Sequence, residues 1–138
     1  MTDMYNTNLD KNDANFVPLT PLSFLKRSAE VYPHKTSIVH GDRIYNWEQT
    51  YKRSLQFASA LSKNGIVKND TVSILSFNTP EIYEADYAVT MIGAILNTIN
   101  IRLDVETIAY ILEHSEAKAL ITDTELSPTV KKLSLIHI

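Results

Sequence analysis

The densest group of side chains suited to ligand chemistry lies between residues 97 and 102, at the end of an apolar segment. Asn97, Thr98 and Asn100 offer amides and a hydroxyl, and Arg102 offers a guanidinium. Ligands of parallel α/β sheets bind outside the carboxyl ends of the strands, which makes these four residues candidate ligand contacts. The alternative is that the amides and the hydroxyl satisfy loop backbone groups and that Arg102 pairs with an acid. The residues by themselves favour neither interpretation.

Three acidic residues also stand where carboxylates can do chemistry. Glu81 and Glu84 fall on one face of a predicted helix, as paired carboxylates must for acid–base catalysis. We favour a solvated helix face instead, with Glu81 stabilised by the positive end of the helix dipole. Asp123 follows a predicted strand, as an acceptor carboxylate would, but no acidic pair stands at another strand end. We interpret Asp123 as a turn or helix-cap residue.

Metal and nucleophile chemistry find no support in the sequence. No histidine stands at metal-ligand spacing from another histidine or an acid, and the chain has no cysteine for a thiolate zinc site or a disulfide. No serine lies in a Gly-x-Ser-x-Gly turn, and the three glycines are too far apart to form one phosphate-binding loop. We therefore assign no catalytic and no metal-binding residue. The histidines interpreted as structural or solvent-facing are His34, His40, His114 and His137.

The composition is that of an ordinary globular domain, with 138 residues, of which 44% are apolar and 21% charged. The net charge of −3 is too small to indicate a nucleic acid or an anionic membrane as partner. No apolar run reaches the roughly 18 residues of a membrane helix, and the polar N-terminus lacks the pattern of a signal peptide. We therefore predict no transmembrane segment and a cytoplasmic location.

The first part of the chain predicts a helix followed by a β-hairpin. Thr20 and Pro21 are a capping residue and a first-turn proline, and the helix must end before Pro33. The runs 36–40 and 43–45 contain β-branched and aromatic residues. A glycine and an aspartate between these runs suit a tight turn.

A second, longer helix follows the predicted hairpin. Asn46 and Gln49 have the spacing of a capping box, and Asn64-Gly65 provides the helix end. Apolar residues recur at helical spacing and predict which face packs inward. They are Trp47, Tyr51, Leu55, Ala58 and Leu61.

Residues 71–123 predict the order β-α-β-α-β. Strands are expected at 71–77, 94–99 and 119–122, with helices beginning at Pro80 and after the capping residue Asp104. Strands joined through helices favour a parallel sheet with right-handed crossovers. The predicted fold class is therefore α/β, a hairpin plus a parallel sheet unit with flanking helices.

The ends of the chain differ from its middle. Residues 1–15 are polar and rich in Asn and Asp, and we interpret them as a flexible arm before a domain that spans residues 16–132. An amphipathic helix begins at Ser127-Pro128 and is expected to stop after residue 132. Residues 133–138 are mainly apolar and have no helix cap, so we interpret the chain as truncated, with 133–138 as a candidate non-native tail.

Several segments, taken in order, resemble the N-terminal part of the adenylate-forming superfamily, in particular the fatty-acyl-CoA synthetases (AMP-dependent acyl-CoA ligases). The resemblance covers about residues 15–132, and the order and spacing of the segments make it specific, although each segment alone is weak. The run Leu96-Asn97-Thr98-Ile99-Asn100 is closest to ligases for medium- and long-chain or methylthiopropionate-like acids. The similar segments are 15–25 with 31–33, 38–51, 68–72 with 78–81, and 91–104.

The resemblance implies a partial AMP-binding domain, part of the large N-terminal domain of a longer ligase. The complete enzyme would activate a fatty or related carboxylic acid with ATP and Mg²⁺ to an acyl-adenylate, and then transfer the acyl group to coenzyme A. In that family the phosphate loop, the magnesium-binding acid, the ribose-binding aspartate and the catalytic lysine all follow the region matched here. The fragment is therefore expected to be inactive and to bind none of these molecules tightly, with residues 97, 98, 100 and 102 near the substrate or coenzyme A.

Two other hypotheses remain open at this stage. The chain could be a self-contained α/β module that binds a ligand or partner without catalysis, or a regulatory protein derived from a ligase. The fragment hypothesis predicts strands without sheet neighbours, open edges and an uncovered apolar face that is prone to aggregation. A self-contained module predicts a cooperatively unfolding monomer instead.

Overall fold

Three parallel strands form the centre of the structure, a computed structural model that describes residues 10–136. Strand β3 (Thr71–Leu75) lies between β4 (Ile95–Thr98) and β5 (Ala117–Thr122), and both pairings are parallel. The predicted α/β class and the β-α-β-α-β order are confirmed, although the first strand ends at Leu75 instead of Phe77. In the described part of the chain, β4 and β5 each have a single neighbour, so the sheet has two open edges.

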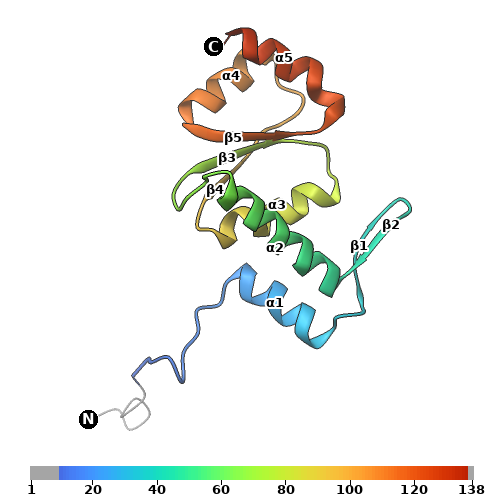
Figure 1. Cartoon of the computed structure of the whole chain (residues 1–138), viewed down its shortest axis with the longest axis vertical. Helices are drawn as coiled ribbons and strands as arrows, with labels where there is room; N and C mark the ends of the chain where they lie inside the picture. Colours follow the sequence, from blue (N-terminus) through green and yellow to red (C-terminus); the bar gives the residue numbers. More distant parts are fainter. Residues whose placement is uncertain (1–9, 137–138) are drawn as a thin grey trace, which may run out of the picture.

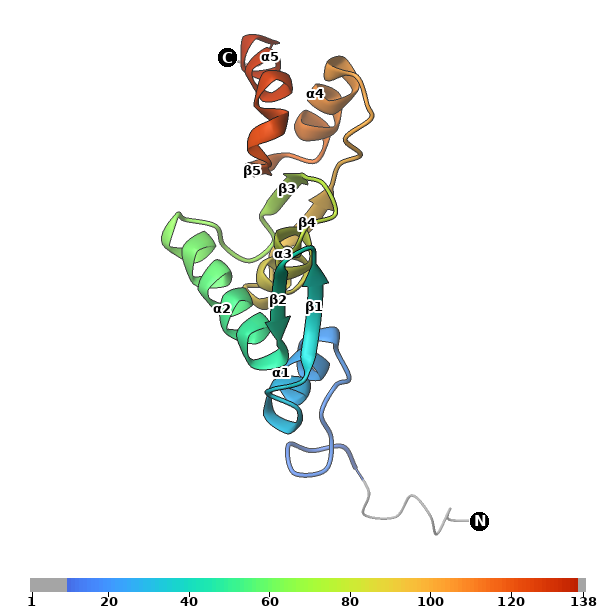
Figure 2. The same cartoon turned by 90° about the vertical axis from the view of Figure 1, so that its right-hand side faces the viewer.

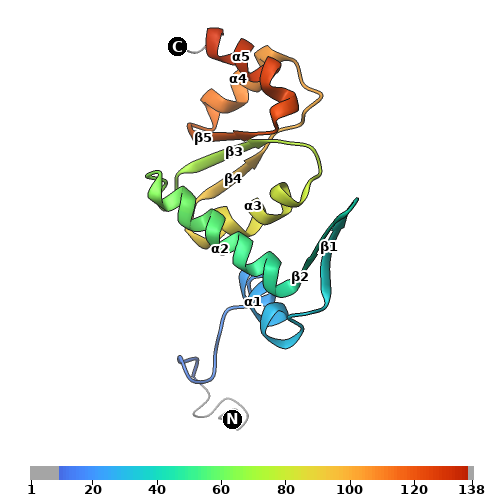
Figure 3. The same ribbon diagram turned by 45° about the vertical axis from the view of Figure 1, so that its right-hand side comes forward.

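Helices cover both faces of this sheet. Helices α2 (Trp47–Lys63) and α3 (Pro80–Met91) lie on one face, and α4 (Val105–His114) and α5 (Ser127–Ile136) lie on the other (Figures 1 and 3). The chain passes from β3 to β4 in one direction and returns across β3 to β5. Because parallel crossovers are right-handed, the reversal of direction places α3 and α4 on opposite faces.

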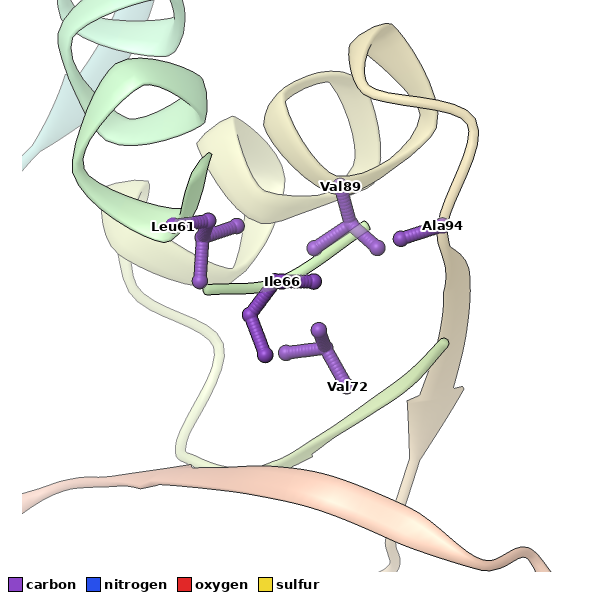
Figure 4. Packing of buried hydrophobic residues seen from close by; sticks show 5 residues of the cluster. All are labelled: Leu61, Ile66, Val72, Val89 and Ala94. Atoms are coloured by element: carbon purple, nitrogen blue, oxygen red, sulfur yellow. The ribbon is translucent and has the colours of Figure 1, made fainter. Parts of the chain in front are cut away.

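One apolar core lies between the sheet and helices α2 and α3. Leu61, Ile66, Val72, Val89 and Ala94 are buried together and point toward one another in Figure 4. Val72 and Val89 have no exposed surface. The alternation of strand side chains sends Val72 toward α2 and α3, and its neighbours in sequence point the other way.

A second core fills the space between the sheet and helices α4 and α5. Its buried members come from β3, the segment after β4, and helices α4 and α5. Ile108 of α4 is fully buried at its centre, and Leu75 is the residue of β3 that faces this side. The sheet therefore separates two apolar cores, as an α/β sheet covered on both faces requires.

The N-terminal elements form a separate layer around α2. Helix α1 (Pro21–Val31) packs against α2, and β1 (Thr36–His40) and β2 (Arg43–Asn46) form a separate antiparallel hairpin, which lies in front of α3 in the view of Figure 2. The helix start at Thr20 is a capping box, and the hairpin turn at Gly41 has a positive φ of 58°. Both features agree with the sequence predictions.

The inward face of α2 differs from the prediction. Thr50 and Ser54 have no exposed surface and lie on the buried face with Ala58 and Leu61, whereas Leu55 is 43% exposed. The hydroxyls donate to backbone carbonyls one turn earlier, Thr50 to Asn46 at 2.9 Å and Ser54 to Thr50 at 2.9 Å. A satisfied hydroxyl can be buried without loss, so small polar residues occupy the face where apolar spacing alone predicted Leu55.

Asn46 holds the start of α2 and allows a direct test of the predicted capping box. Its Oδ1 accepts from the Gln49 amide at 2.8 Å, and the Gln49 side chain accepts from the Asn46 amide at 3.0 Å. We expect Asn46→Ala to lower the free energy of unfolding by about 1 kcal/mol in urea denaturation followed by circular dichroism. Asn46→Asp keeps the acceptor and should retain most of the stability; equal losses in both variants would contradict a capping role.

The two ends of the chain agree only in part with the expectations. Residues 10–19 are exposed along their whole length, and residues 1–9 of the predicted arm lie outside the described residues. At the other end α5 does not stop after residue 132 but runs to Ile136, and Leu133 is 4% exposed within the second core. The helix continues because Leu133 gains an apolar partner surface on α4. The arm, the domain limits and the non-native tail stay predictions, and residues 137–138 are not described.

Candidate ligand site at the carboxyl ends of the parallel strands

The carboxyl ends of β3 and β4 diverge, which opens the structure at this edge. The chain leaves β3 toward the face covered by α3 and leaves β4 toward the face covered by α4 (Figure 3). In open α/β sheets the crevice at such a reversal of strand order is where ligands bind. The topology therefore selects the same edge that the polar residues of the sequence indicated.

A hollow of about 510 Å³ lies at this edge. The loop after β3 contributes Ser76, Phe77 and Asn78, and Ile82 of α3 lines one wall. The opposite wall is formed by the end of β4 and the loop after it. Those residues are Thr98, Ile99, Asn100, Ile101 and Arg102.

Three of the four residues singled out in the sequence line this hollow, and Asn97 does not. The Asn97 amide group donates to Ser73 Oγ at 2.9 Å and to Ser115 Oγ at 3.2 Å, which links β4 to β3 and to the end of α4. Consecutive strand residues point to opposite faces, so Asn97 and Thr98 cannot line the same wall. Asn97 therefore holds the sheet together on the α4 side.

Asn100 and Arg102 shape the loop that follows β4. The Asn100 side-chain oxygen accepts from the Arg102 amide at 2.9 Å, a local turn of the kind asparagine forms readily. Asn100 thus has the backbone role that the structural interpretation expected. Arg102 is exposed, and among residues 10–136 no acidic side chain pairs with its guanidinium, in contrast to the ion pair considered from the sequence.

Asp123 fixes the loop after β3 from the neighbouring strand. One of its carboxylate oxygens accepts from the Phe77 amide at 2.7 Å and from Ser76 Oγ at 2.9 Å. Asp123 stands at the start of the short helix Thr124–Leu126, but its side chain caps no amide of that helix, in contrast to the helix-cap role considered from the sequence. The amide that it binds belongs to the loop after β3. Sequence spacing could not reveal this contact because the partners are 46 residues apart.

The expectation of a solvated face for Glu81 and Glu84 is wrong for Glu84. Glu84 is only 3% exposed and accepts two hydrogen bonds from the guanidinium of Arg53 in α2, one of them at 3.0 Å. Glu81 pairs with Arg43 of the hairpin. These carboxylates join three elements and show the geometry of structural ion pairs, not of an acid–base pair.

The charges of Arg43, Arg53, Glu81 and Glu84 stabilise one another. The hydrogen bond with Glu84 raises the pKa of Arg53 above its ordinary value, although burial opposes the shift. Partial burial is the largest single influence on Glu81 and raises its pKa. The hydrogen bonds from Arg43, from Thr79 and from the backbone, together with the charge of Arg43, outweigh it, so the net pKa lies below the ordinary glutamate value. The contribution of Glu81 to stability is thus present above the ordinary glutamate pKa and is lost as the pH falls through the lowered value.

The described residues hold no group of three or more His, Cys, Asp or Glu side chains that could bind a metal ion. Within the same part of the chain, no helix is long and apolar enough to cross a membrane. His114 ends α4 and stacks on Tyr110 with ring centroids 5.5 Å apart, whereas His137 lies outside the described residues. None of the three histidines that the structure describes lines the hollow.

Comparison with known proteins places the chain among ligases. The family model described as AMP-binding enzyme matches residues 25–137. A trans-cinnamate:CoA ligase of Petunia hybrida is 52% identical over 124 residues, which is 90% of this chain and 22% of that protein. A butyrate–CoA ligase of Arabidopsis thaliana is 48% identical over 126 residues, again 22% of its length. The chain thus spans about a fifth of the curated relatives it matches.

Solved structures agree with the sequence comparison. A fatty acyl CoA synthetase of Mycobacterium tuberculosis superposes with a TM-score of 0.78 at 26% identity, over 80% of this chain and 22% of that one. The N-terminal domain of a second structure from that organism, titled FACL13, gives 0.79 at 26% identity, over 83% of this chain and 30% of that one. With its family match over residues 25–137, this chain belongs to the AMP-binding enzymes, and its curated relatives are CoA ligases.

Proposed function

We propose that this chain forms part of an acid–CoA ligase that uses ATP. In the first step a carboxylate oxygen attacks the α-phosphorus of ATP, and the bond to pyrophosphate breaks. In the second step the thiol of coenzyme A attacks the acyl carbonyl carbon, loses its proton and displaces AMP. The observation that carries this proposal is the identity of about one half with CoA ligases over most of the chain.

The geometry of the hollow supports a role in contacting the ligand, not in carrying out the chemical steps. The hollow at the ends of β3 and β4 presents hydroxyl, amide and guanidinium groups, but its lining contains no carboxylate and no histidine that could move a proton. We therefore propose that Thr98, Asn100 and Arg102 contact the substrate or coenzyme A, and that residues outside this chain carry out the chemical steps. Asn97 supports the wall from the opposite face of the sheet.

The described residues do not fit a magnesium site. The lining of the hollow offers no carboxylate, and the described part of the chain has no cluster of three metal-ligating side chains. Magnesium favours carboxylates together with substrate phosphates as its ligands. No step proposed for this segment runs through a metal ion.

The names of the relatives bear on two further parts of the proposal, the carboxylic acid substrate and the cellular location. The relatives are named for cinnamate and butyrate, and both names include the word peroxisomal. We propose a small carboxylic acid as the substrate, and the cytoplasmic location stays a prediction. A self-contained binding module is not favoured, because the segment aligns as one part of much longer ligases.

Activity assays on two proteins test the proposal. The 138-residue chain alone, incubated with ATP, Mg²⁺, coenzyme A and carboxylic acids, is expected to release no pyrophosphate above background. A chimera in which residues 25–132 replace the aligned segment of the Petunia hybrida ligase should release pyrophosphate and form trans-cinnamoyl-CoA. The unaltered Petunia hybrida enzyme is the matched control.

Each outcome has a clear meaning. Robust pyrophosphate release by the chain alone would contradict the expectation that residues elsewhere carry the chemistry. A chimera that folds, as judged by its circular dichroism and melting curve, yet makes neither pyrophosphate nor thioester would contradict the assignment to a CoA ligase.

A further inference from the structure

A hollow of about 350 Å³ lies between the start of α1 and one side of α3. Helix α3 contributes Tyr83, Asp86, Tyr87 and Thr90, and the start of α1 contributes residues 20–22. The residues of α3 recur at spacings of three and four, so they lie on one side of that helix. This α1–α3 hollow shares no lining residue with the hollow at the ends of β3 and β4, so a ligand bound here goes beyond the proposed function.

Asp86 is the only charged residue in the lining of the α1–α3 hollow. Its side chain is exposed, yet partial burial raises the pKa of its carboxyl above the ordinary aspartate value. Within residues 10–136, no hydrogen bond or ion pair reaches this carboxylate. A partly desolvated carboxylate without a donor is stabilised by a cation that brings donors of its own.

Two tyrosine rings border the same hollow. Tyr83 and Tyr87 are in edge-to-face contact, with ring centroids 5.2 Å apart and planes at 74°, and their hydroxyls share a hydrogen bond of 3.2 Å. Burial above all, together with the contact with Tyr87 and the charge of Asp86, raises the pKa of Tyr83, so its ring stays a neutral phenol. An edge-to-face pair uses one face of one ring only, and a ring face attracts an ammonium group.

The lining of the α1–α3 hollow offers little to an anion. It contains no lysine, arginine or histidine. Pro21 has no amide hydrogen, and the amides of Thr20 and Ser23 bond within the capping box of α1. The Thr90 hydroxyl donates to carbonyl groups of its own helix. The hollow therefore presents acceptors and ring faces, which favour a cation that carries N–H donors.

The size and the apolar part of the hollow narrow the class of cation. Pro21 and Leu22 provide hydrocarbon surface that an alkyl chain can cover. A primary ammonium has three N–H donors for a carboxylate, whereas a quaternary ammonium has none. We infer that the α1–α3 hollow binds a small primary amine as its alkylammonium ion. The nitrogen lies between the Asp86 carboxylate and the Tyr87 ring, and the alkyl chain lies along Leu22.

Titrations of the isotope-labelled 138-residue chain with n-butylamine, followed by NMR, test this inference. At neutral pH the amine carries its proton, and n-butanol is a neutral probe of nearly the same shape. We expect millimolar binding of n-butylamine that shifts the amides of residues 20, 22 and 83–90. Binding of n-butanol should be about tenfold weaker, since a charge-assisted hydrogen bond is lost. Sodium chloride keeps the ionic strength equal in the two titrations.

Matched variants separate the charge from the ring. Asp86→Asn keeps the shape of the side chain and should weaken the binding of n-butylamine about tenfold, while the binding of n-butanol stays the same. Tyr87→Leu removes a ring and should weaken n-butylamine about threefold, whereas Tyr87→Phe retains the ring face and should bind like the original chain. Asp42→Asn removes an exposed aspartate in the hairpin turn and should leave both affinities unchanged.

Three results would each overturn the ammonium site: equal affinities for n-butylamine and n-butanol, an affinity that Asp86→Asn leaves unchanged, or shifts that do not saturate. The methylamide of N-acetyl-lysine separates a small molecule from a protein side chain. If it binds and n-butylamine does not, the occupant is a lysine of a partner protein, which also overturns the small-amine assignment. None of these outcomes depends on the activity of the chimera, so the ammonium site and the ligase assignment fail separately.

Discussion

Replacement of Ile108 by alanine is expected to lower the free energy of unfolding by about 3 kcal/mol, within the range of core truncations. Ile108 has no exposed surface and lies in the core between the sheet and α5, in a cluster with Leu75 and Leu133. The cavity left by the missing carbons would be lined by side chains from the sheet and two helices, which cannot all move inward. Urea denaturation of the full chain measures the loss.

A control on the same helix separates packing from helix formation. Glu113 is exposed on α4, and Glu113→Ala should leave the free energy of unfolding nearly unchanged. A domain of this size is stabilised by about 5–15 kcal/mol, so the Ile108 loss should move the urea midpoint visibly. Similar small changes in both variants would mean that the second core does not pack as described.

The local signals of the sequence were sufficient for most element boundaries. The capping residues Thr20, Asn46 and Asp104 start helices where predicted, because capping depends on residues within one turn. The order of strands and helices followed from alternating and helical spacing. The strand order β4-β3-β5 was not predicted, since it depends on which edges pair after the crossovers form.

The predictions that were wrong concern partners distant in the sequence or the direction of single side chains. Glu84 is buried because Arg53, 31 residues earlier, reaches it. Asn97 was grouped with Thr98 by sequence adjacency, although strand alternation separates them, and this signal was present in the sequence. Three of four candidate residues nevertheless line the hollow, because the end of a parallel strand fixes the place of its loop.

The ion pair between α2 and α3 also fixes the hairpin, because the Arg53 guanidinium lies 4.6 Å from the ring centroid of Tyr45 in β2. One flat cation thus contacts a buried carboxylate and an aromatic ring from different elements. Removal of the carboxylate leaves Arg53 without its two hydrogen bonds and opens a gap in the packing of α2 on α3. Within the described part of the chain, Arg53 would then be held only by Glu81, at 3.7 Å, and could shift against the Tyr45 ring, which Arg43 also contacts at 5.8 Å.

We therefore expect Glu84→Ala to lower the free energy of unfolding by about 2–3 kcal/mol. This is less than the roughly 3–5 kcal/mol of a fully buried pair, because Arg53 keeps 35% of its side chain exposed to water. Glu84→Gln keeps an acceptor oxygen and the packing volume, so its loss should be clearly smaller. Glu48→Ala removes the exposed ion pair with Lys52 on α2, the helix that carries Arg53, and should change the free energy of unfolding little. If all three variants unfold at the same urea concentration as the original chain, the ion pair does not join α2 to α3. If only the two Glu84 variants lose stability, the pair joins these helices. Altered NMR resonances of Tyr45 in those two variants would show that the pair holds the hairpin as well.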